Sequence, residues 1–321
     1  MKILHAIIIT LGMGSGAYGQ DIHFSHLNHS KLFINPGFAG SGKTDHLTIS
    51  HRNLSPAGFG NYLTYKASYN QYFKKINSGI GLMLIRDTQG SGAIKRTYIS
   101  GIYAYRIKLQ NNLHISPALE FKYASASLNT KNLIFPEMFN PTTWDISKSK
   151  LPEGIQQSSG YLEFNTGAVL RYTNEYLRTY RDLTAGLAVH HINKPHVLMN
   201  AENRINPRVT AFFNIELYMN RLATYQRSTL LIPTFLYSWQ TRSDYFQYGA
   251  YLKYKNFVLG GFIRHNSRLQ FFTPIIQMGV IFSEFAINYS YDSGFLNYKR
   301  ASVISGAHEV TLSINFSIRD Q

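Results

Sequence analysis

The stretch that decides the fold lies near the C-terminus and reads Val310-Thr311-Leu312-Ser313-Ile314-Asn315-Phe316-Ser317-Ile318. Apolar and small polar residues alternate along it without interruption. Because successive side chains of a β-strand point to opposite faces, one face of this strand is apolar and the other is polar. The same alternation returns about every twenty residues back to position 46, which indicates a protein built from repeated strands of this kind.

The repeated alternation predicts about fourteen strands, each close to the roughly 9–11 residues that a tilted membrane strand requires. Tyrosine occurs mostly toward the strand ends, as in the aromatic girdle of a membrane barrel. Short polar turns such as 110–112 and 255–256 connect neighbouring strands, which is typical of hairpins. The predicted strands lie near 46–53, 60–72, 78–88, 95–107, 112–124, 160–173, 181–191, 205–217, 228–239, 243–254, 256–265, 272–282, 284–292 and 306–318.

The composition indicates a surface that charge does not cover. Charged residues make up only 15% of the chain, against about a quarter in a typical soluble domain, while aromatic residues make up 14%. The longest apolar run, 3–11, is too short for the roughly 20 residues of a spanning helix. Since lipid offers no partner for backbone polar groups, a closed antiparallel up-and-down barrel is the remaining membrane fold.

A soluble β-sandwich is the alternative to a barrel. It would place charged residues on one face of most strands. Here the polar faces consist mainly of Ser, Thr, Asn, Gly and Gln, which favours a barrel with a wet interior.

The N-terminus has the pattern of an export signal. Lys2 precedes the apolar run, and small residues at 17 and 19 offer a cleavage site ahead of Gln20. The chain has no cysteine, so we expect neither a lipoprotein-type anchor nor disulfides. The predicted parts are a signal peptide (1–19), an N-terminal extension that could act as a plug (20–45) and the barrel (46–321).

Basic residues outnumber acidic ones by 32 to 17, but they are spread over strand ends and turns rather than gathered in one stripe. This distribution favours basic rims near anionic headgroups or an acidic partner over nucleic acid. We therefore expect outer-membrane lipid among the partners, and no nucleic acid. Two long connections, 125–159 and 192–204, interrupt the short turns, and we expect the first to shape a docking surface.

Residues 37–44 satisfy the P-loop pattern G-x-x-x-x-G-K-[ST], in which backbone amides bind phosphates. A working P-loop leaves a buried strand and enters a helix. Here Asn35-Pro36 precede the motif, and strand periodicity follows it from Asp45. The context therefore argues against nucleotide binding.

No residue set favours catalysis or metal binding. His23, His26 and His29 are three apart, but no Cys or Glu nearby completes a ligand set. No nucleophile elbow or Ser/His/Asp spacing is apparent. We predict no catalytic, cofactor-binding or metal-binding residues and no enzymatic activity, while an outer-membrane enzyme with residues from separate strands is the least favoured alternative.

The N-terminal part resembles a known family. The stretch Gln20-Asp21-Ile22-His23-Phe24-Ser25, followed by Asn35-Pro36-Gly37-Phe38-Ala39-Gly40, is similar to the opening of PorP/SprF-type proteins of the type IX secretion system. That family usually reads Gln-Asp-Pro-x-Phe-Ser and then Asn-Pro-Ala-Phe-Ala-Gly. Ile22 replaces the Pro and Gly37 the first Ala.

The C-terminal part resembles the same family. It contains Asn288-Tyr289-Ser290-Tyr291-Asp292 and, further on, Gly306-Ala307-His308-Glu309-Val310-Thr311-Leu312. The residues that the resemblance marks as contacts to a plug or a partner are Asn35, Pro36, Gly37, Phe38, Ala39, Gly40, Tyr289, Tyr291, Asp292, His308 and Glu309.

The resemblance implies an outer-membrane barrel of a Gram-negative bacterium that supports protein secretion and gliding motility. It implies two kinds of partner: a secreted protein attached to the cell surface through its type IX C-terminal domain, and periplasmic or peptidoglycan-linked components of the secretion machinery. A diffusion porin or a channel for small hydrophobic molecules is the alternative, since fourteen strands enclose a lumen that side chains need not fill.

Overall fold

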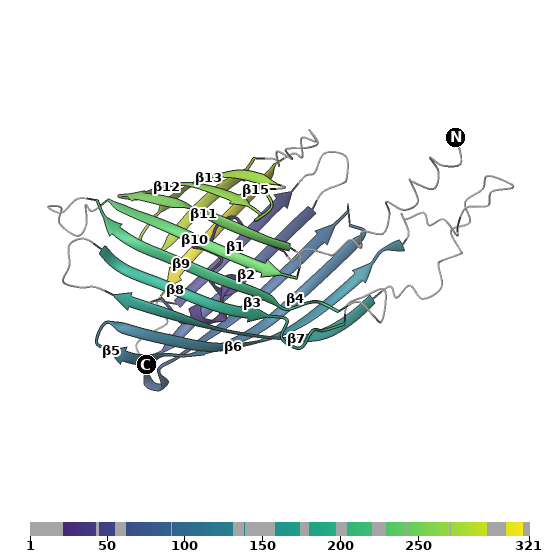
Figure 1. Ribbon diagram of the computed structural model, residues 1–321, viewed down its shortest axis with the longest axis horizontal. Helices are drawn as coiled ribbons and strands as arrows, with labels where there is room; N and C mark the ends of the chain where they lie inside the picture. The colour runs from purple at the N-terminus through teal and green to yellow at the C-terminus, as the bar shows by residue number, and fades with distance from the viewer. Residues whose placement is uncertain are drawn as a thin grey trace.

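The protein is a closed antiparallel β-barrel with a short N-terminal segment inside it (Figure 1). The computed structural model describes residues 22–42, 45–54, 62–90, 92–130, 138, 158–173, 180–196, 204–219, 229–241, 243–269, 271–293 and 306–316. The predicted signal peptide at 1–19 lies outside the described residues, as does most of the connection 125–159.

Fifteen strands form the wall. They are β1 (Asp45–Leu54), β2 (Tyr62–Phe73), β3 (Ser78–Gln89), β4 (Ile94–Tyr105), β5 (Ile107–Gln110), β6 (Leu113–Leu128), β7 (Ser158–Thr173), β8 (Tyr180–His190), β9 (Arg208–Tyr218), β10 (Leu230–Gln240), β11 (Ser243–Tyr254), β12 (Phe257–His265), β13 (Phe272–Ile281), β14 (Phe285–Asp292) and β15 (Ala307–Phe316). The described helices are short: α2 (Lys31–Ile34), η1 (Pro36–Phe38) and η2 (Lys74–Ile76).

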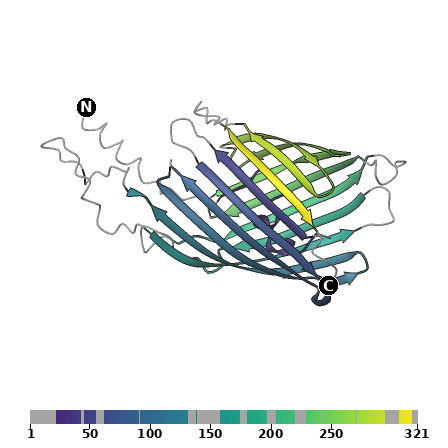
Figure 2. The same ribbon diagram turned by 180° about the vertical axis from the view of Figure 1, so that it is seen from behind.

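Each strand pairs with its neighbours in sequence, and the first strand pairs with the last. The β1–β15 ladder runs from Asp45 opposite Phe316 to Leu54 opposite Ala307 and closes the barrel (Figure 2). β4 and β5 both pair with β6 and are separated only by Arg106, so together they cross the wall once. The fifteen strands therefore make fourteen crossings, which confirms the predicted fold and strand number.

The two faces of the wall are inverted relative to a soluble protein. Outward side chains are large, apolar and exposed, such as Leu82 (57%) and Leu187 (64%). Inward side chains are polar and buried, such as Gln247 and Thr311, each 0% exposed. An exposed apolar belt of this kind is stable against acyl chains rather than water. The alternation read from 310–318 produces this inversion, since one face meets lipid and the other the lumen.

The two ends of the barrel differ in their connections. One end carries the start of β1, the end of β15 and short turns such as 111–112, 255–256 and 282–284; we call it the turn end. The other end carries the long connections 129–157, 191–207 and 293–306, and we call it the loop end. In outer-membrane barrels, turns on the periplasmic side are short and loops on the outer side are long.

The predicted and observed strands differ most at the end of β6. The alternation predicts an end at 124 for the fifth strand and a start at 160 for the sixth, but β6 continues to Leu128 and β7 begins at Ser158. These extra residues are mostly Ser and Ala, whose weak alternation hides a strand. Among the described residues, no helix is long and apolar enough to cross a membrane.

Candidate functional site

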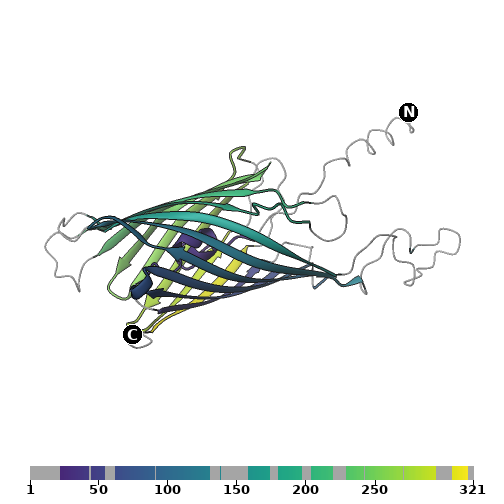
Figure 3. The ribbon, with the colours of Figure 1, turned by 90° about the horizontal axis from the view of Figure 1, so that it is seen from below.

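Residues 22–42, the N-terminal segment, run through the lumen from the loop end to the turn end. Figure 3 shows their short helix inside the ring of strands. Ser25 contacts residues near the loop end of β1 and β14, whereas Gly40 lies against Gly79 near the turn end of β3. Two groups of residues hold the segment, one at each end, and a middle portion lies between them.

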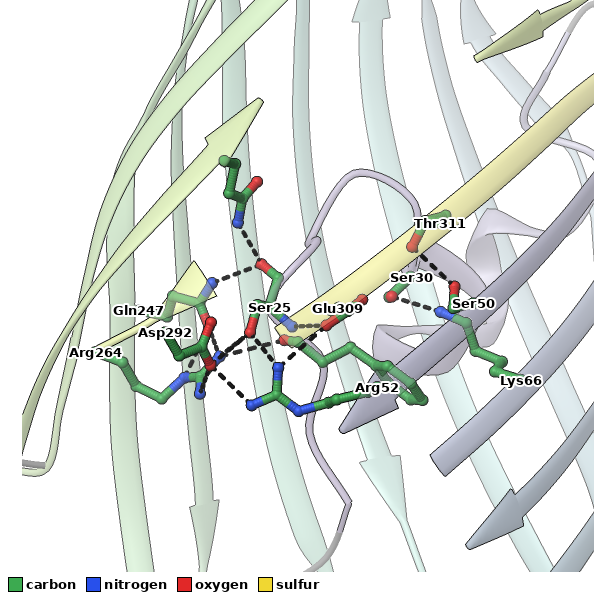
Figure 4. Close-up of polar contacts among 12 residues, drawn as sticks. Ser25, Ser30, Ser50, Arg52, Lys66, Gln247, Arg264, Asp292, Glu309 and Thr311 are labelled. Atoms are coloured by element: carbon green, nitrogen blue, oxygen red, sulfur yellow. Dashed lines mark hydrogen bonds and ion pairs between the residues drawn. The ribbon is translucent and has the colours of Figure 1, made fainter. Parts of the chain in front are cut away.

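The first group surrounds Ser25 and consists of Arg52, Arg264, Asp292 and Glu309, which we call the charged anchor (Figure 4). The Ser25 backbone N–H donates to Glu309 Oε2 at 2.7 Å, and its hydroxyl donates to Asp292 Oδ2 at 2.6 Å. Arg52 donates to the Ser25 hydroxyl at 2.6 Å. The segment is therefore tied to strands 267 and 284 residues away in sequence.

The charged anchor is buried and electrically balanced. Arg52 lies 2.7 Å from Asp292 and 3.3 Å from Glu309, while Arg264 lies 3.2 Å from Asp292. None of these four side chains is more than 6% exposed. Two guanidinium groups thus face two carboxylates, and removal of any one would leave an uncompensated charge in a site that water barely reaches.

Two amides complete the coordination of Ser25. Gln247 and Gln277 donate to the Ser25 carbonyl at 3.0 and 2.7 Å, and Arg264 in turn donates to Gln247 at 2.8 Å. The backbone N–H, the backbone carbonyl and the hydroxyl of Ser25 therefore all have partners on the wall. Such complete pairing fixes one position for the segment, because any shift would leave buried polar groups unpaired.

The middle of the segment carries two histidines, of which His26 is buried and His29 is half-buried. His29 Nδ1 lies 2.9 Å from the Ser313 hydroxyl, and the rings of His26 and His29 are 5.9 Å apart. Burial lowers the pKa of His26 below its ordinary value of 6.5. Burial also lowers the pKa of His29, well below 6.5, and the positive charges of neighbouring groups act in the same direction. Both imidazoles are thus neutral where the segment is seated.

The second group is the motif Asn35–Gly40 with the wall glycines Gly79, Gly167 and Gly186, which we call the glycine anchor. Asn35 Nδ2 donates to the carbonyls of Ala168 on β7 and Leu187 on β8, at 3.0 and 2.9 Å. A Cβ at Gly167 or Gly186 would run into the Asn35 amide. The two glycines therefore form the notch that receives this side chain.

The rest of the motif touches the wall backbone to backbone. The Asn35 side chain accepts from the Gly37 N–H and so caps η1. A Cβ on Gly37 would lie 2.7 Å from the Ser116 carbonyl. Gly40 has a φ of 63° and approaches Gly79, which itself abuts the Ala39 carbonyl. Glycine is required most clearly at Gly40 and Gly79, where a positive φ or a carbonyl at the Cβ position excludes a side chain.

Apolar contacts complete the packing. Leu27, Ile34 and Phe38 share a buried cluster with residues of β7 and β9–β13, and Phe38 meets Phe212 edge to face at 5.4 Å. Leu32 and Ala39 pack with β4 and β6, while Phe24 packs with β3. Together with its hydrogen bonds, the segment shares a polar contact or an apolar cluster with each of the fourteen crossings.

The structure separates the sequence-marked residues into two groups. Asn35, Pro36, Gly37, Phe38, Ala39 and Gly40 lie in the glycine anchor, and Asp292 and Glu309 lie in the charged anchor. Tyr289, Tyr291 and His308 instead face outward, where the Tyr289 hydroxyl lies 2.8 Å from His308 Nδ1. The marked residues of β14 and β15 thus lie on both faces of the wall, because successive side chains of a strand point to opposite faces.

Sequence reasoning missed most partners of these residues. Sequence reasoning did not single out Arg52 or Arg264. Arg52 follows Thr48 and Ser50 on the inward face of β1. Arg264 follows Gly260 and Phe262 on the inward face of β12. A charged residue at an inward position of a predicted strand is a usable signal, because a charge buried inside a barrel needs a counter-ion. Gly79, Gly167 and Gly186 carried no such signal, since glycine is common along all the strands.

The other sequence motifs take unremarkable positions. The P-loop lookalike begins in η1 and leads into strand β1 rather than a helix; residues 43 and 44 lie outside the described residues. Within the described part of the chain, no group of three or more His, Cys, Asp or Glu is arranged to hold a metal ion.

The N-terminal segment and the wall residues that hold it both lie within the part of the chain that one protein family matches. The model of the type IX secretion system membrane protein PorP/SprF matches residues 16–314, nearly the whole chain. The chain belongs to the PorP/SprF family. Its family and its barrel fold place it in the outer membrane and among the proteins of type IX secretion.

Solved structures resemble the barrel only in outline. The Pseudomonas putida toluene transporter TodX has 9% identity and a TM-score of 0.47, covering 92% of this chain and 95% of its own. The Acinetobacter baumannii outer membrane protein Omp33 has 8% identity and a TM-score of 0.46, covering 85% and 98%. The KdgM porin has 8% identity and a TM-score of 0.39, covering 84% and 99%. No curated protein sequence matches this chain.

Proposed function

We propose that this barrel holds a secreted partner protein at the cell surface through that protein's type IX C-terminal domain, and that the barrel lumen is not the path of the partner. The observation that carries the proposal is the N-terminal segment, which shares a hydrogen bond or an apolar cluster with every crossing of the wall. A segment seated this completely leaves the outer rim and loops, rather than the lumen, as the surface for a protein partner.

The two ends then have separate tasks. By the usual asymmetry of loop lengths, the loop end faces the outside and is the place where a secreted protein would be held. The turn end faces the periplasm, and its exposed lysines, Lys74, Lys75, Lys108 and Lys255, present positive charge there. We expect this rim to face anionic headgroups and the periplasmic or peptidoglycan-linked components of the machinery.

The proposal assigns no chemistry to the chain. The four buried charges of the charged anchor position Ser25, and each of them already faces a counter-ion. We therefore expect no enzymatic activity. We also expect export to remove residues 1–19, which N-terminal sequencing of the protein from outer membranes would test by finding Gln20 first.

Co-purification tests the proposed function. The tagged chain, expressed in its own host and extracted in mild detergent, should retain a secreted protein whose C-terminal domain has the type IX form. A tagged outer-membrane barrel of another family is the matched control and should retain none. Recovery of the chain without such a partner, together with normal surface display of secreted proteins when the chain is deleted, would overturn the proposal and favour the diffusion porin.

A further inference from the structure

Strand β7 extends beyond the neighbour that should cover it. It pairs with β6 over its whole length, up to Ser158 opposite Ser127. Its ladder with β8 covers only 166–173, and β8 ends at His190. The first eight residues of β7 therefore have no β8 partner. In a barrel this is exceptional, because closure normally leaves no strand edge open.

The end of β8 is an ordered turn that specific contacts hold in place. His191 has a φ of 58° and Lys194 a φ of 44°, so the chain turns away from the sheet there. The His191 N–H donates to Asn165 Oδ1 at 2.7 Å, and its ring lies 3.1 Å from Glu163, which is itself 2.8 Å from Lys122. These side chains are buried, so the departure of the chain from β7 is fixed by packed polar contacts.

Asn193 closes the lower part of the exposed edge. The Ile192 N–H donates to the Phe164 carbonyl at 3.0 Å. The Asn193 side chain accepts from the Phe164 N–H at 3.2 Å and donates to the Leu162 carbonyl at 2.7 Å. Leu162 and Phe164 face outward and are 59% and 40% exposed, at the level of the apolar belt. A backbone edge at that depth needs such partners because lipid supplies none.

Above Asn193 the edge is open. The backbone groups of alternate residues point to the same side of a strand, so those of Ser158 and Gly160 point to the side that Phe164 uses. Among the described residues, none donates to or accepts from the backbone of Ser158 or Gly160 on that side. The outward positions beside them on β6 are Ser125 and Ser127 instead of Phe121. The open stretch thus lies in water, just outside the apolar belt.

We infer that the stretch Ser158–Leu162, the β7 edge, receives an extended strand of the secreted partner and adds it to the barrel wall. This inference rests on the proposed function. Strand addition uses backbone hydrogen bonds for affinity and side-chain pockets for selection. Gly160 offers no such pocket, because the Tyr123 ring and hydroxyl already cover the place where its side chain would lie. The affinity of the incoming strand would therefore rest on backbone hydrogen bonds to the edge.

A second copy of the chain fits the β7 edge poorly. Every ladder of this barrel is antiparallel. Antiparallel pairing of β7 with β7 of another copy would turn that copy upside down, with its turn end toward the outside. Two barrels inserted in one membrane share one orientation, so the edge suits a strand that arrives from the loop side.

A defined peptide tests the β7 edge in the purified barrel. The probe is a fluorescent ten-residue peptide of alternating Val and Thr with one central Tyr, and binding is read by fluorescence anisotropy in detergent. The variant Ser158→Pro/Gly160→Pro removes two edge donors whose N–H groups do not pair with β6, a position where Pro is tolerated. The matched control Ser158→Ala keeps the donor. We expect the double variant to bind at least about ten-fold more weakly and the control within about two-fold of wild type.

A cross-link locates the peptide. The chain has no cysteine, so Ser158→Cys places a unique thiol on the edge. Peptides with a single cysteine at successive positions should cross-link at alternate positions, with the strongest yield at one register. Equal peptide affinity in the proline and alanine variants, or cross-linking without register, would overturn the inference. The inference would also be overturned if the wild-type barrel formed a dimer and the proline variant were monomeric, because the edge would then bind a second copy of the chain.

The same variants separate this inference from the proposed function. If wild type and the proline variant retain the secreted partner equally in the co-purification, the docking function is supported and the assignment of the β7 edge as its binding site is wrong. If wild type retains no partner, the proposed function fails whatever the peptide does. If the proline variant alone loses the partner and the peptide, while its heat-resistant barrel migration is unchanged, both proposals are supported.

Discussion

The charged anchor and the glycine anchor hold the same segment by different physics. The charged anchor consists of four buried charges that meet at Ser25 near the loop end. The glycine anchor consists of close backbone contacts and one amide near the turn end. The first depends on charge balance, and the second on the absence of side chains. Loss of a charge and gain of a methyl group should therefore affect opposite ends of the segment.

The two anchors should also release the N-terminal segment from the wall one after the other. The glycine anchor is joined to β1 through only a few residues, since Gly40 is followed by β1 at Asp45. The charged anchor is far from this tether in sequence and lies near the loop end of the barrel. Opening of the segment should therefore begin at Ser25 and end at Gly40. Hydrogen–deuterium exchange of residues 22–42, measured in detergent micelles, reads both ends separately.

The largest expected effect comes from Arg52→Ala. It leaves Asp292 and Glu309 short of one positive charge in a buried site, which costs about 3–5 kcal/mol. Exchange should accelerate strongly at 22–30 and much less at 33–41. Arg86→Ala is the control, because Arg86 is an exposed outward arginine that does not touch the segment. Equal acceleration at both ends would remove the distinction between the anchors.

The next effect is expected from Gly79→Ala. The added Cβ would overlap the Ala39 carbonyl and force the segment off the wall, at a cost of about 1–3 kcal/mol. Exchange should accelerate at 33–41 first. Gly101→Ala, on the neighbouring strand, is the matched control because a Cβ there meets nothing within 4 Å. If Gly79→Ala and Gly101→Ala change the exchange at 33–41 equally, close backbone contact does not explain how the glycine anchor holds the segment.

A smaller effect is expected from Asn35→Ala, which removes two hydrogen bonds to wall carbonyls and costs about 1–2 kcal/mol. Asn35→Asp keeps the shape but points a negative charge at those carbonyls, so it should be the more damaging of the two. Local opening free energies from exchange would rank them. An aspartate that is tolerated better than alanine would contradict the assigned amide orientation.

The smallest effect is expected from pH. Burial lowers the pKa values of His26 and His29 below 6.5, so a released segment binds more protons than a seated one as pH falls below 6.5. The seated state is therefore most stable well above pH 6.5 and loses stability as the pH falls through 6.5. His29→Gln should reduce this loss. Exchange at 22–30 that is the same at pH 7.5 and 5.5, after correction for intrinsic rates, would contradict it.

Much of the wall follows from the sequence because alternation is a local property. The stretch 310–318 predicts its strand unaided, and thirteen of the fourteen predicted strands have both ends within three residues of the observed ends. The additional strand residues 125–128 escaped because Ser and Ala give no contrast between faces. The family resemblance marked Asp292 and Glu309, but their shared contact with Ser25 depends on the closure of β1 against β15.

The remaining features could not be predicted because they arise between strands. The notch for Asn35 needs Gly167 on β7 and Gly186 on β8 to be diagonal neighbours, and one sequence does not reveal that register. The β7 edge depends on the difference in length between two strands and on the turn at His191. Relative lengths and left-handed turns at non-glycine residues leave little trace in the pattern of apolar and polar residues.

Single-channel recording in planar bilayers tests the central claim most directly, namely that the seated N-terminal segment keeps the lumen from acting as a pore. Wild-type barrel should show no steady open current, whereas Arg52→Ala/Gly79→Ala, in which both anchors are broken, should show long-lived openings. A steady current of equal size through wild type and the double variant would contradict the account.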